Sequence, residues 1–300
     1  VVGFTAQNRT NEYVYMKATG LLDDNVTYHN MGSAVDKRNT SISSSFTELQ
    51  RYSVLARVNY TYDKRYHFTL TGRYDGSSLF SAGNKWAFFP AGAFKWTISN
   101  EKFMRGTKHW LTDLSLRLSA GISGNDSVSS YVSQMVLTNT HGWLFESGQE
   151  VAFYPSRVDN PNLTWETQTK LTVAVNTRLF DRLNVGVEYY KRQTNDMLMD
   201  VPVPYTTGYA EITSNTGTLQ NRGIDVNINY DILKGKDYYL GVNFNFNYNS
   251  EKITELFDGR TRWEIANTGV CYVVGKPIMF YYPIFAGINP ENGKQQWYVP

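Results

Sequence analysis

Apolar and polar residues alternate along much of the chain. Between Leu114 and Ser123 every second residue is apolar, and the residues between them are Ser, Arg or Gly. A period of two is that of a β-strand with one apolar and one polar face. The same alternation occurs in neighbouring segments joined by a short turn, as in 53–62 and 66–75, where only Leu55 breaks the pattern. Each such pair is predicted to form a β-hairpin.

The alternation predicts about ten complete strands and the start of another near Lys294. Most have ten or more residues, which exceeds the five or six usual in soluble sheets and matches the roughly 9 to 11 that cross a bilayer at a tilt. The predicted strands cover residues 1–8, 48–62, 66–75, 86–98, 114–123, 162–180, 183–193, 217–232, 238–249 and 276–289.

Short and long connections alternate between these strands. The short turns are 63–65, 181–182 and 234–237, and the long loops are roughly 9–47, 76–85, 124–161, 194–216 and 250–274. One connection, Ser99 to Asp113, falls on the short-turn side but is longer, and we expect a helical turn in it. Short turns at one rim and long loops at the other are typical of outer-membrane barrels, whereas soluble sandwiches distribute loop lengths less systematically.

Aromatic residues gather at the short-turn ends of the predicted strands. Tyr62 and Tyr66 flank the first turn, Tyr230 and Tyr238 flank the last, and Trp96 precedes the longer connection. These positions are typical of the aromatic girdle at the level of the lipid headgroups. Aromatic pairs across neighbouring strands of a soluble sheet are the alternative interpretation.

Composition excludes several classes of protein. The chain has 300 residues with 29 Lys and Arg against 27 Asp and Glu, and no clustered basic stripe that a nucleic-acid binder needs. The longest apolar stretch, Ile278 to Ile288, is too short for a membrane-spanning helix and is interrupted by Pro283. The single cysteine, Cys271, excludes an internal disulfide. Because the chain starts without Met and ends in what reads as a new strand, we expect it to be part of a longer protein.

The sequence contains no motif of a catalytic, metal or cofactor site. The histidines are far apart, and there is no Gly-rich phosphate loop and no Gly-x-Ser-x-Gly motif, so no enzyme, metal or cofactor is predicted. Polar-face carboxylates could form a glycosidase pair across a lumen. Arginines on the same faces favour a ladder of opposite charges that lines a wet interior instead. These carboxylates are Asp75, Glu166, Glu188 and Asp225.

Several ordered blocks of sequence resemble one family. The segment 73–80, followed by 84–90 and Trp96, resembles the most recognisable block of the SusC/RagA family of TonB-dependent outer-membrane transporters. The resemblance extends over the chain from about Arg51 onward. It departs from the family at Leu79, where the family tends to have Arg, and at 279–283, which replaces a more glycine-containing run. The further blocks are 114–125, 160–166, 189–198 with Pro202 and Pro204, 215–225, 243–249 and 275–287.

The resemblance implies an all-β fold and a location. Residues 1–300 would be part of a TonB-dependent receptor β-barrel domain, an antiparallel transmembrane barrel of roughly 22 strands of which this chain is about half. The plug domain, the segment that engages TonB and the final strands would lie outside it. The protein would sit among the lipids of the outer membrane of a Gram-negative bacterium.

The resemblance also implies an activity and partners. The expected function is active import of oligosaccharides, or of peptides, together with a SusD-like surface lipoprotein, in a dimer of such pairs. Two functions of other classes remain: a passive porin or autotransporter barrel without a plug, and a soluble β-sandwich carbohydrate-binding module.

Seven residues are candidates for contact with plug, solute or partner. Trp143 and Phe145, in the loop 124–161, would stack on a sugar or pack against the lipoprotein, and packing within the loop is the alternative. The other five are predicted to line the polar inner wall, where simple solvation is the alternative. They are Arg57, Arg73, Asp75, Arg117 and Glu188.

Overall fold

The computed structural model describes the backbone of residues 1–145, 148–265, 269–280 and 283–298, and their side chains except those of residues 24, 37, 38 and 140–152. Short 3₁₀ helices occur only in connections of this described part: η1 (Asp24–Val26), η2 (Met31–Ser33), η3 (Ile98–Asn100), η4 (Lys102–Thr107), η5 (Tyr205–Thr207) and η6 (Phe257–Gly259). None of the helices described here is long and apolar enough to cross a bilayer.

The strands are β1 (Val2–Thr19), β2 (Asp36–Tyr62), β3 (Tyr66–Ser77), β4 (Trp86–Thr97), β5 (Leu111–Asn125), β6 (Val136–Phe145), β7 (Gly148–Arg157), β8 (Glu166–Leu179), β9 (Leu183–Asn195), β10 (Leu198–Pro202), β11 (Glu211–Asn215), β12 (Thr218–Lys234), β13 (Tyr239–Glu255), β14 (Arg262–Ile265), β15 (Val270–Val273), β16 (Met279–Phe280), β17 (Ile284–Ile288) and β18 (Gln295–Tyr298).

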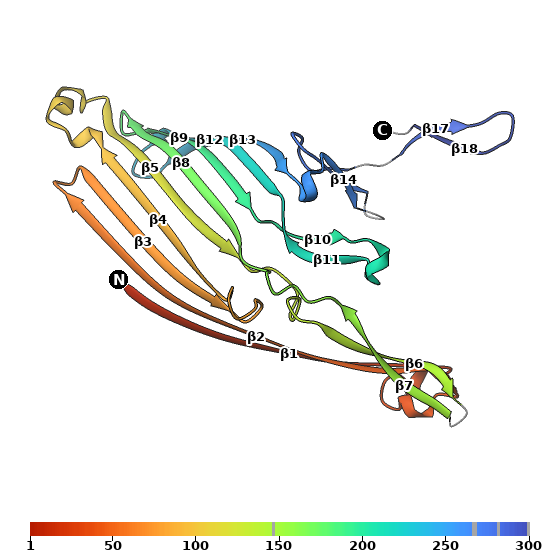
Figure 1. Ribbon diagram of the computed structural model, residues 1–300. Coiled ribbons are helices and arrows are strands. Elements are labelled where there is room, and N and C mark those ends of the chain that lie inside the picture. Colours follow the sequence, from red (N-terminus) through yellow and green to blue (C-terminus); the bar gives the residue numbers. More distant parts are fainter. Residues whose placement is uncertain (146–147, 266–268, 281–282, 299–300) are drawn as a thin grey trace.

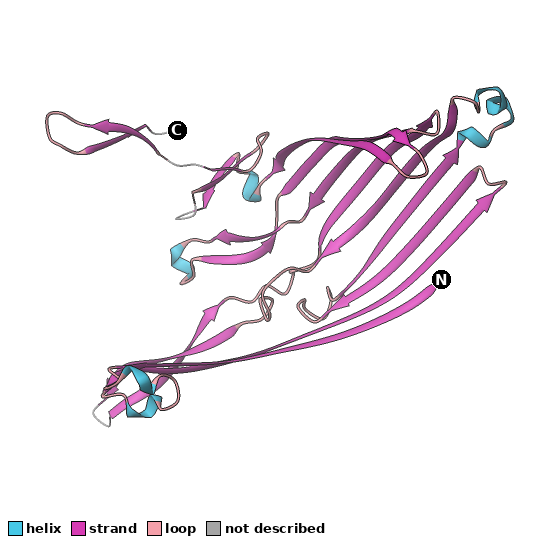
Figure 2. Ribbon diagram, turned by 180° about the vertical axis from the view of Figure 1, so that it is seen from behind, coloured by secondary structure: helices cyan, strands magenta, loops and turns pink. Residues whose placement is uncertain are grey.

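Nine of the described strands form one antiparallel sheet in the order β1-β2-β3-β4-β5-β8-β9-β12-β13. The sheet is a single curved layer, open at β1 and at β13 (Figures 1 and 2). The insertions between its strands form separate hairpins, β6-β7 and β10-β11. The prediction of an all-β antiparallel wall is therefore confirmed.

One face of the main sheet is apolar from edge to edge. A row of directly opposed residues starts at Tyr60 and Phe68 and ends at Ile224 and Tyr248. Side chains on this face are largely uncovered: Tyr60 is 57%, Leu70 is 65% and Phe244 is 53% exposed. A second sheet would bury them, so the β-sandwich alternative is wrong. The full row is Tyr60, Phe68, Phe94, Leu118, Val173, Tyr189, Ile224 and Tyr248.

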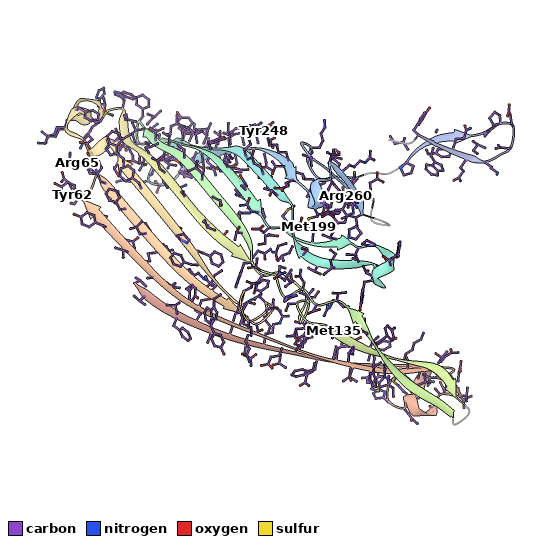
Figure 3. The ribbon with its side chains drawn as sticks, viewed as in Figure 1. Tyr62, Arg65, Met135, Met199, Tyr248 and Arg260 are labelled. Carbon is purple, nitrogen blue, oxygen red and sulfur yellow. The ribbon has the colours of Figure 1, made fainter. Side chains whose placement is uncertain are left out.

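The opposite face is polar along the same strands. Because side chains alternate across a strand, each residue next to an apolar-row residue points to this second face. One of its rows is Thr61, His67, Lys95, Arg117, Ala174, Glu188, Asp225 and Asn247. Figure 3 shows the side chains standing off both faces of the single layer.

Aromatic side chains mark both ends of the apolar face. At the short-turn rim, the Tyr66 ring stacks on Tyr62 and on Trp96, with centroids 6.4 Å and 6.5 Å away. Figure 3 labels Tyr62 at this rim. At the other end of β4, the Trp86 ring stacks on Tyr74 at 5.1 Å. Trp86 and Trp96 are about 33 Å apart along the strand at about 3.3 Å per residue. With a tilt of about 40° they are separated by about 25 Å in height, the usual height of the apolar band of a membrane barrel.

The strands extend past the second aromatic level into the long-loop side. Predicted strand 1–8 and predicted loop 9–47 are wrong in their boundaries, because β1 continues to Thr19 and β2 begins at Asp36. Residues 36–51 of β2 alone span about 50 Å beyond that level, at about 3.3 Å per residue. Predicted loops 124–161 and 194–216 likewise contain the β6-β7 and β10-β11 hairpins. In these segments apolar and polar residues occur together on both faces, so there is no alternation that would predict a strand.

The predicted strand 276–289 is also wrong. Met279–Phe280 pairs with β15, and Ile284–Ile288 pairs with β18 in a hairpin outside the main sheet. Pro277 and Pro283 lack the backbone N–H that a ladder requires, which prevents one continuous strand. Asn289–Gly293 forms the turn of that hairpin, where the Asn289 side chain accepts a hydrogen bond from the Glu291 N–H.

The long connection at the short-turn rim folds around the Glu101 carboxylate. This carboxylate accepts hydrogen bonds from the Tyr66 hydroxyl at 2.6 Å, the Trp96 indole N–H at 3.0 Å and the Arg65 guanidinium at 2.7 Å. The Tyr66 hydrogen bond, followed by those from Trp96 and Arg65, lowers the pKa of Glu101 to about 2. The expected helical turn is present as η3 and η4. Glu101 thus joins this connection to the ends of β3 and β4.

The first prediction concerns the two faces of β2. We expect Val58→Arg to destabilise the full-length protein in lipid vesicles by about 2–4 kcal/mol, since it places a charge at the middle of the apolar face. The matched control, Asn59→Arg, alters the neighbouring polar-face residue and removes one hydrogen bond from Thr69, a loss of about 0.5–1.5 kcal/mol. Urea unfolding in vesicles measures both. Equal losses for the two variants would contradict the assignment of faces.

The second prediction concerns pH. Because the folded-state pKa of Glu101 is lowered from 4.5 to about 2, its stabilisation is complete above about pH 4.5 and is lost as pH falls toward 2. Glu101→Gln should lower the urea midpoint at pH 7, and the difference from wild type should shrink below pH 4.5. Asp181→Asn, a carboxylate that is 70% exposed at another turn of this rim, is the control and should change little at pH 7. A pH-independent effect of Glu101→Gln would refute the mechanism.

Candidate functional site

A groove of about 490 Å³ lies on the polar face near the long-loop end of strands β2 to β5. We call it the polar-face groove. It contains both signs of charge, from Arg51, Arg73, Asp75 and Asp126, beside the aromatic side chains of Phe89 and Trp165. Charged groups beside aromatic rings can hold a polar solute without covalent chemistry.

An ion pair joins the wall of the groove to a long loop. Arg51, on β2, donates to Asp126 from Nε at 2.7 Å and from Nη2 at 2.8 Å. Asp126 directly follows β5, which is separated from β2 by β3 and β4. The Asp126 side chain is only 13% exposed, so the carboxylate of this bidentate pair is shielded from solvent, while the Arg51 side chain is 37% exposed. It holds the start of the loop 126–165 over the groove.

A small apolar cluster holds two long loops on the same face. We call it the loop core: Phe80, Phe89, Val132, Leu163 and Trp165, all nearly fully buried. The Trp165 ring packs on Phe80 and Phe89 at 5.3 Å and 5.5 Å between centroids.

Hydrogen bonds reinforce the loop core. The Trp165 indole donates to the Lys85 carbonyl at 3.2 Å, and the Ser133 hydroxyl donates to the Leu79 carbonyl at 2.9 Å. At Gly124 a Cβ atom would collide with the Phe89 ring, so glycine is required there. Loops 78–85 and 126–165 therefore form one packed unit.

The five predicted wall residues all lie on the polar face, in two groups. Arg73 donates to Asp75 at 2.7 Å and to Ser53 at 3.2 Å, inside the polar-face groove. Arg57 lies beside this group and donates to Thr71 at 3.2 Å.

The second group lies closer to the short-turn rim. Arg117 donates to Glu188 at 2.6 Å, and the Lys170 ammonium lies 4.0 Å from the other oxygen of Glu188. Asp225 accepts a hydrogen bond from Asn247 on the neighbouring strand. At the long-loop end of β8, Glu166 accepts from Asn125 at 3.1 Å and from the Leu198 N–H at 3.1 Å. Each candidate carboxylate thus has cationic or amide partners, which is the ladder arrangement and not a pair poised for acid–base catalysis.

The backbone of Trp143 and Phe145 belongs to β6, opposite residues of β7. Their side chains lie outside the described residues, so their roles stay predictions. Among the described residues there is no group of three potential metal-ligating side chains.

Sequence reasoning missed several residues of the groove and the loop core. Alternation along β2 could have predicted Arg51 as a polar-face residue, because it is in phase with Ser53 and Arg57. Asp126 and Val132 had none, since they lie in a loop without periodicity. Leu55, which broke the alternation, lies over Gly3 of β1, where a Cβ would be 3.3 Å from Leu55 Cγ.

Comparison with known families and proteins gives a consistent result. The family described as "TonB dependent receptor-like, beta-barrel" matches residues 2–278. TonB-dependent receptor P3 of Formosa agariphila is 34% identical over 259 residues, which are 86% of this chain and 25% of the relative. TonB-dependent receptor SusC of Bacteroides thetaiotaomicron is 33% identical over 212 residues, 69% of this chain and 21% of the relative.

Solved structures agree over the full chain. The RagAB peptide importer in its closed-closed state superposes with a TM-score of 0.84 and 31% identity, covering 100% of this chain and 32% of that chain. The same importer in its open-open state superposes with a TM-score of 0.85 and 30% identity, and it also covers 100% of this chain and 32% of that chain. The chain therefore spans about a quarter of the length of these curated relatives and about a third of the solved chains.

The third prediction concerns the ion pair that holds the loop. We expect Arg51→Ala to accelerate hydrogen exchange of the amides of residues 127–134 by at least tenfold, because a charge-assisted hydrogen bond contributes about 1.5–3 kcal/mol. Hydrogen exchange with mass spectrometry on the full-length protein measures this. Arg57→Ala, which removes an arginine of the same face that bonds only Thr71 among the contacts described above, should leave these amides unchanged. Equal acceleration in both variants would contradict the prediction.

Proposed function

This chain belongs to the TonB-dependent receptor-like β-barrel family, and on that premise we propose that it forms part of the wall of an active importer of polar nutrients. The family consists of transporters rather than enzymes and resides in the outer membrane of Gram-negative bacteria. The apolar face of the main sheet then meets lipid and the polar face meets the lumen.

The observation that carries the proposal is the division of one uncovered sheet into two faces. Apolar rows run across eight strands between two aromatic levels about 25 Å apart in height, as a bilayer requires. The polar face carries ladders of paired charges, which tolerate water on the lumen side. The loop core packs two loops onto the polar face, and in the proposed barrel these loops would narrow the outer end of the lumen.

We assign the five polar-face residues to the solute path. Arg73 and Asp75 line the polar-face groove, while Arg57, Arg117 and Glu188 lie further toward the short-turn rim. The arginines of these pairs are about half exposed, and an exposed ion pair contributes only about 0–1 kcal/mol, so a solute or plug group can replace one partner at low cost. Transport needs no covalent step: the solute is held by hydrogen bonds and released inward when the plug moves.

The energy source and partners follow the family pattern. The plug and the TonB-binding segment belong to the rest of the protein, and TonB transmits the inner-membrane proton gradient. A SusD-like lipoprotein would cover the long-loop side, where β1 and β2 extend beyond the other strands of the main sheet and the β6-β7 hairpin lies (Figure 1). Trp143 and Phe145 of β6 are our candidates for this contact or for a sugar, and two such pairs would form a dimer.

The cargo is an oligosaccharide or a peptide. The similarity to a structure described as a peptide importer supports peptides, and the polar-face groove, with charges beside two aromatic rings, suits either class. The second function, a passive porin-type barrel, shares the wall and differs in energy dependence.

The fourth prediction tests active import. Cells of the source bacterium with the full-length gene should take up a fluorescently labelled pool of oligosaccharides or of peptides, and deletion of the gene should abolish this uptake. A protonophore or deletion of tonB should reduce it at least tenfold, because opening the plug requires energy. Uptake that persists without TonB would favour the passive barrel, and no gene-dependent uptake of either pool would reject the import proposal.

A further inference from the structure

A second hollow, of about 610 Å³, lies between the two loop hairpins on the long-loop side. We call it the loop groove. Its volume is within the range of about 300–1,000 Å³ found for small-molecule sites. Figure 3 labels Met135 and Met199, which lie next to β6 and in β10, at the bases of the two hairpins. Its polar lining includes Tyr154, Arg157, Asp200, Tyr209, Glu211 and Thr213.

Hydrogen bonds hold both sides of the loop groove in place. On the β7 side, Arg157 Nη2 donates to the Tyr131 carbonyl at 2.8 Å and so joins the hairpin to loop 126–135. On the β10-β11 side, Asn160 donates to the Thr213 carbonyl at 2.8 Å. Thr213 lies opposite Asp200 in register and donates its hydroxyl to that carboxylate. Arg157, Thr213 and Asp200 of the lining are therefore held in position by contacts within the chain.

The turn between β10 and β11 brings Tyr209, one of the two tyrosines of the lining, to the loop groove. Gly208 ends η5 with φ of 82°, a conformation that favours glycine. The chain reverses there, which places Tyr209 and Glu211 in the lining with Asp200. Tyr154 from β7 also belongs to the lining, so each hairpin contributes one phenol ring.

The floor of the loop groove is continuous with the loop core. Val132 lines the loop groove and is a member of the loop core, and Leu198 lines it and packs against that core. Trp165, on the same core, lines the polar-face groove. The two hollows therefore share one apolar wall, and the loop groove lies at the outer side of the path toward the lumen.

The chemistry of the lining favours one class of ligand. Carboxylates accept strong hydrogen bonds from hydroxyl groups, and tyrosine rings offer flat apolar surfaces that also carry a hydroxyl. The lining holds two carboxylates against one guanidinium, so its net negative charge would repel an anionic ligand. The Arg157 guanidinium donates from Nη2 to Tyr131, while its buried Nε has no partner among the described residues and is free to donate to a neutral oxygen of a ligand. A neutral oligosaccharide presents many hydroxyl donors and apolar ring faces together, and it carries no charge.

We propose that the loop groove is a capture subsite for a neutral oligosaccharide, with Asp200 and Glu211 accepting sugar hydroxyls and Tyr154 and Tyr209 contacting the ring faces. The inference rests on the proposed import function and specifies its cargo. Only the loop core would separate a sugar bound there from the polar-face groove. The polar-face groove would then be the next polar site that the sugar meets on its way into the lumen.

The fifth prediction tests binding directly. The full-length transporter in detergent is assayed on an array of neutral oligosaccharides of four to seven units (gluco, xylo, manno, galacto and fructo series), with oligogalacturonates and peptides of the same lengths. At least one neutral series should bind. Asp200→Asn and Tyr209→Ala should each weaken that binding at least tenfold, whereas Tyr209→Phe, which keeps the ring, should retain most of it.

Controls separate binding from folding. Asp181→Asn, at the opposite rim, should bind as wild type does, and heat-modifiability on gels should show that every variant is folded. The inference is overturned when no neutral series binds, when only peptides or oligogalacturonates bind, or when Asp200→Asn and Tyr209→Ala bind as tightly as wild type. In cells, gene-dependent sugar uptake that Asp200→Asn leaves unchanged overturns the subsite alone. Loss of all gene dependence overturns the import function itself.

Discussion

The backbone of a membrane wall must satisfy its own hydrogen bonds, because hydrocarbon offers no partners. The main sheet meets this constraint through long antiparallel ladders, such as the register of β8 with β9 from Thr167 to Leu179. Once the ladder is fixed, alternation allows each strand to present an apolar side chain to lipid and a polar one to water. The exposed tyrosines and leucines of one face are therefore the expected surface of a protein that is solvated by lipid, and they are not an unfinished core.

Much of this wall could be predicted from the sequence because its physics is local. Alternation identified the strands between the two aromatic levels, and the tight turns fixed their pairing. The same reasoning failed where a strand is wet on both sides, as in the upper parts of β1 and β2, since polar residues then occupy both faces. It failed again near the C-terminal end, where prolines interrupt an otherwise apolar segment and the pieces pair locally.

The candidate sites were only partly predictable, since they depend on contacts between distant segments. The wall residues Arg57, Arg73 and Arg117 follow from the alternation, but the partner of Arg51 lies 75 residues away in a loop. The loop core gives a physical explanation for three of the sequence blocks that resemble the family, 73–80, 84–90 and 160–166. Phe80, Phe89 and Trp165 lie within the blocks that carry the resemblance, and together they form most of the loop core. Their role is to attach the loops, which no periodic pattern could reveal.

The loop core separates two kinds of evolutionary freedom. On the membrane side of Phe89 and Trp165, a substitution must keep the backbone hydrogen bonds between strands, and it must keep an apolar face toward lipid and a polar face toward the lumen. Outward of them, β6 pairs with β7 and β10 pairs with β11, apart from the main sheet. The outer parts of these hairpins can therefore change in sequence while the wall beneath them keeps the same backbone ladders.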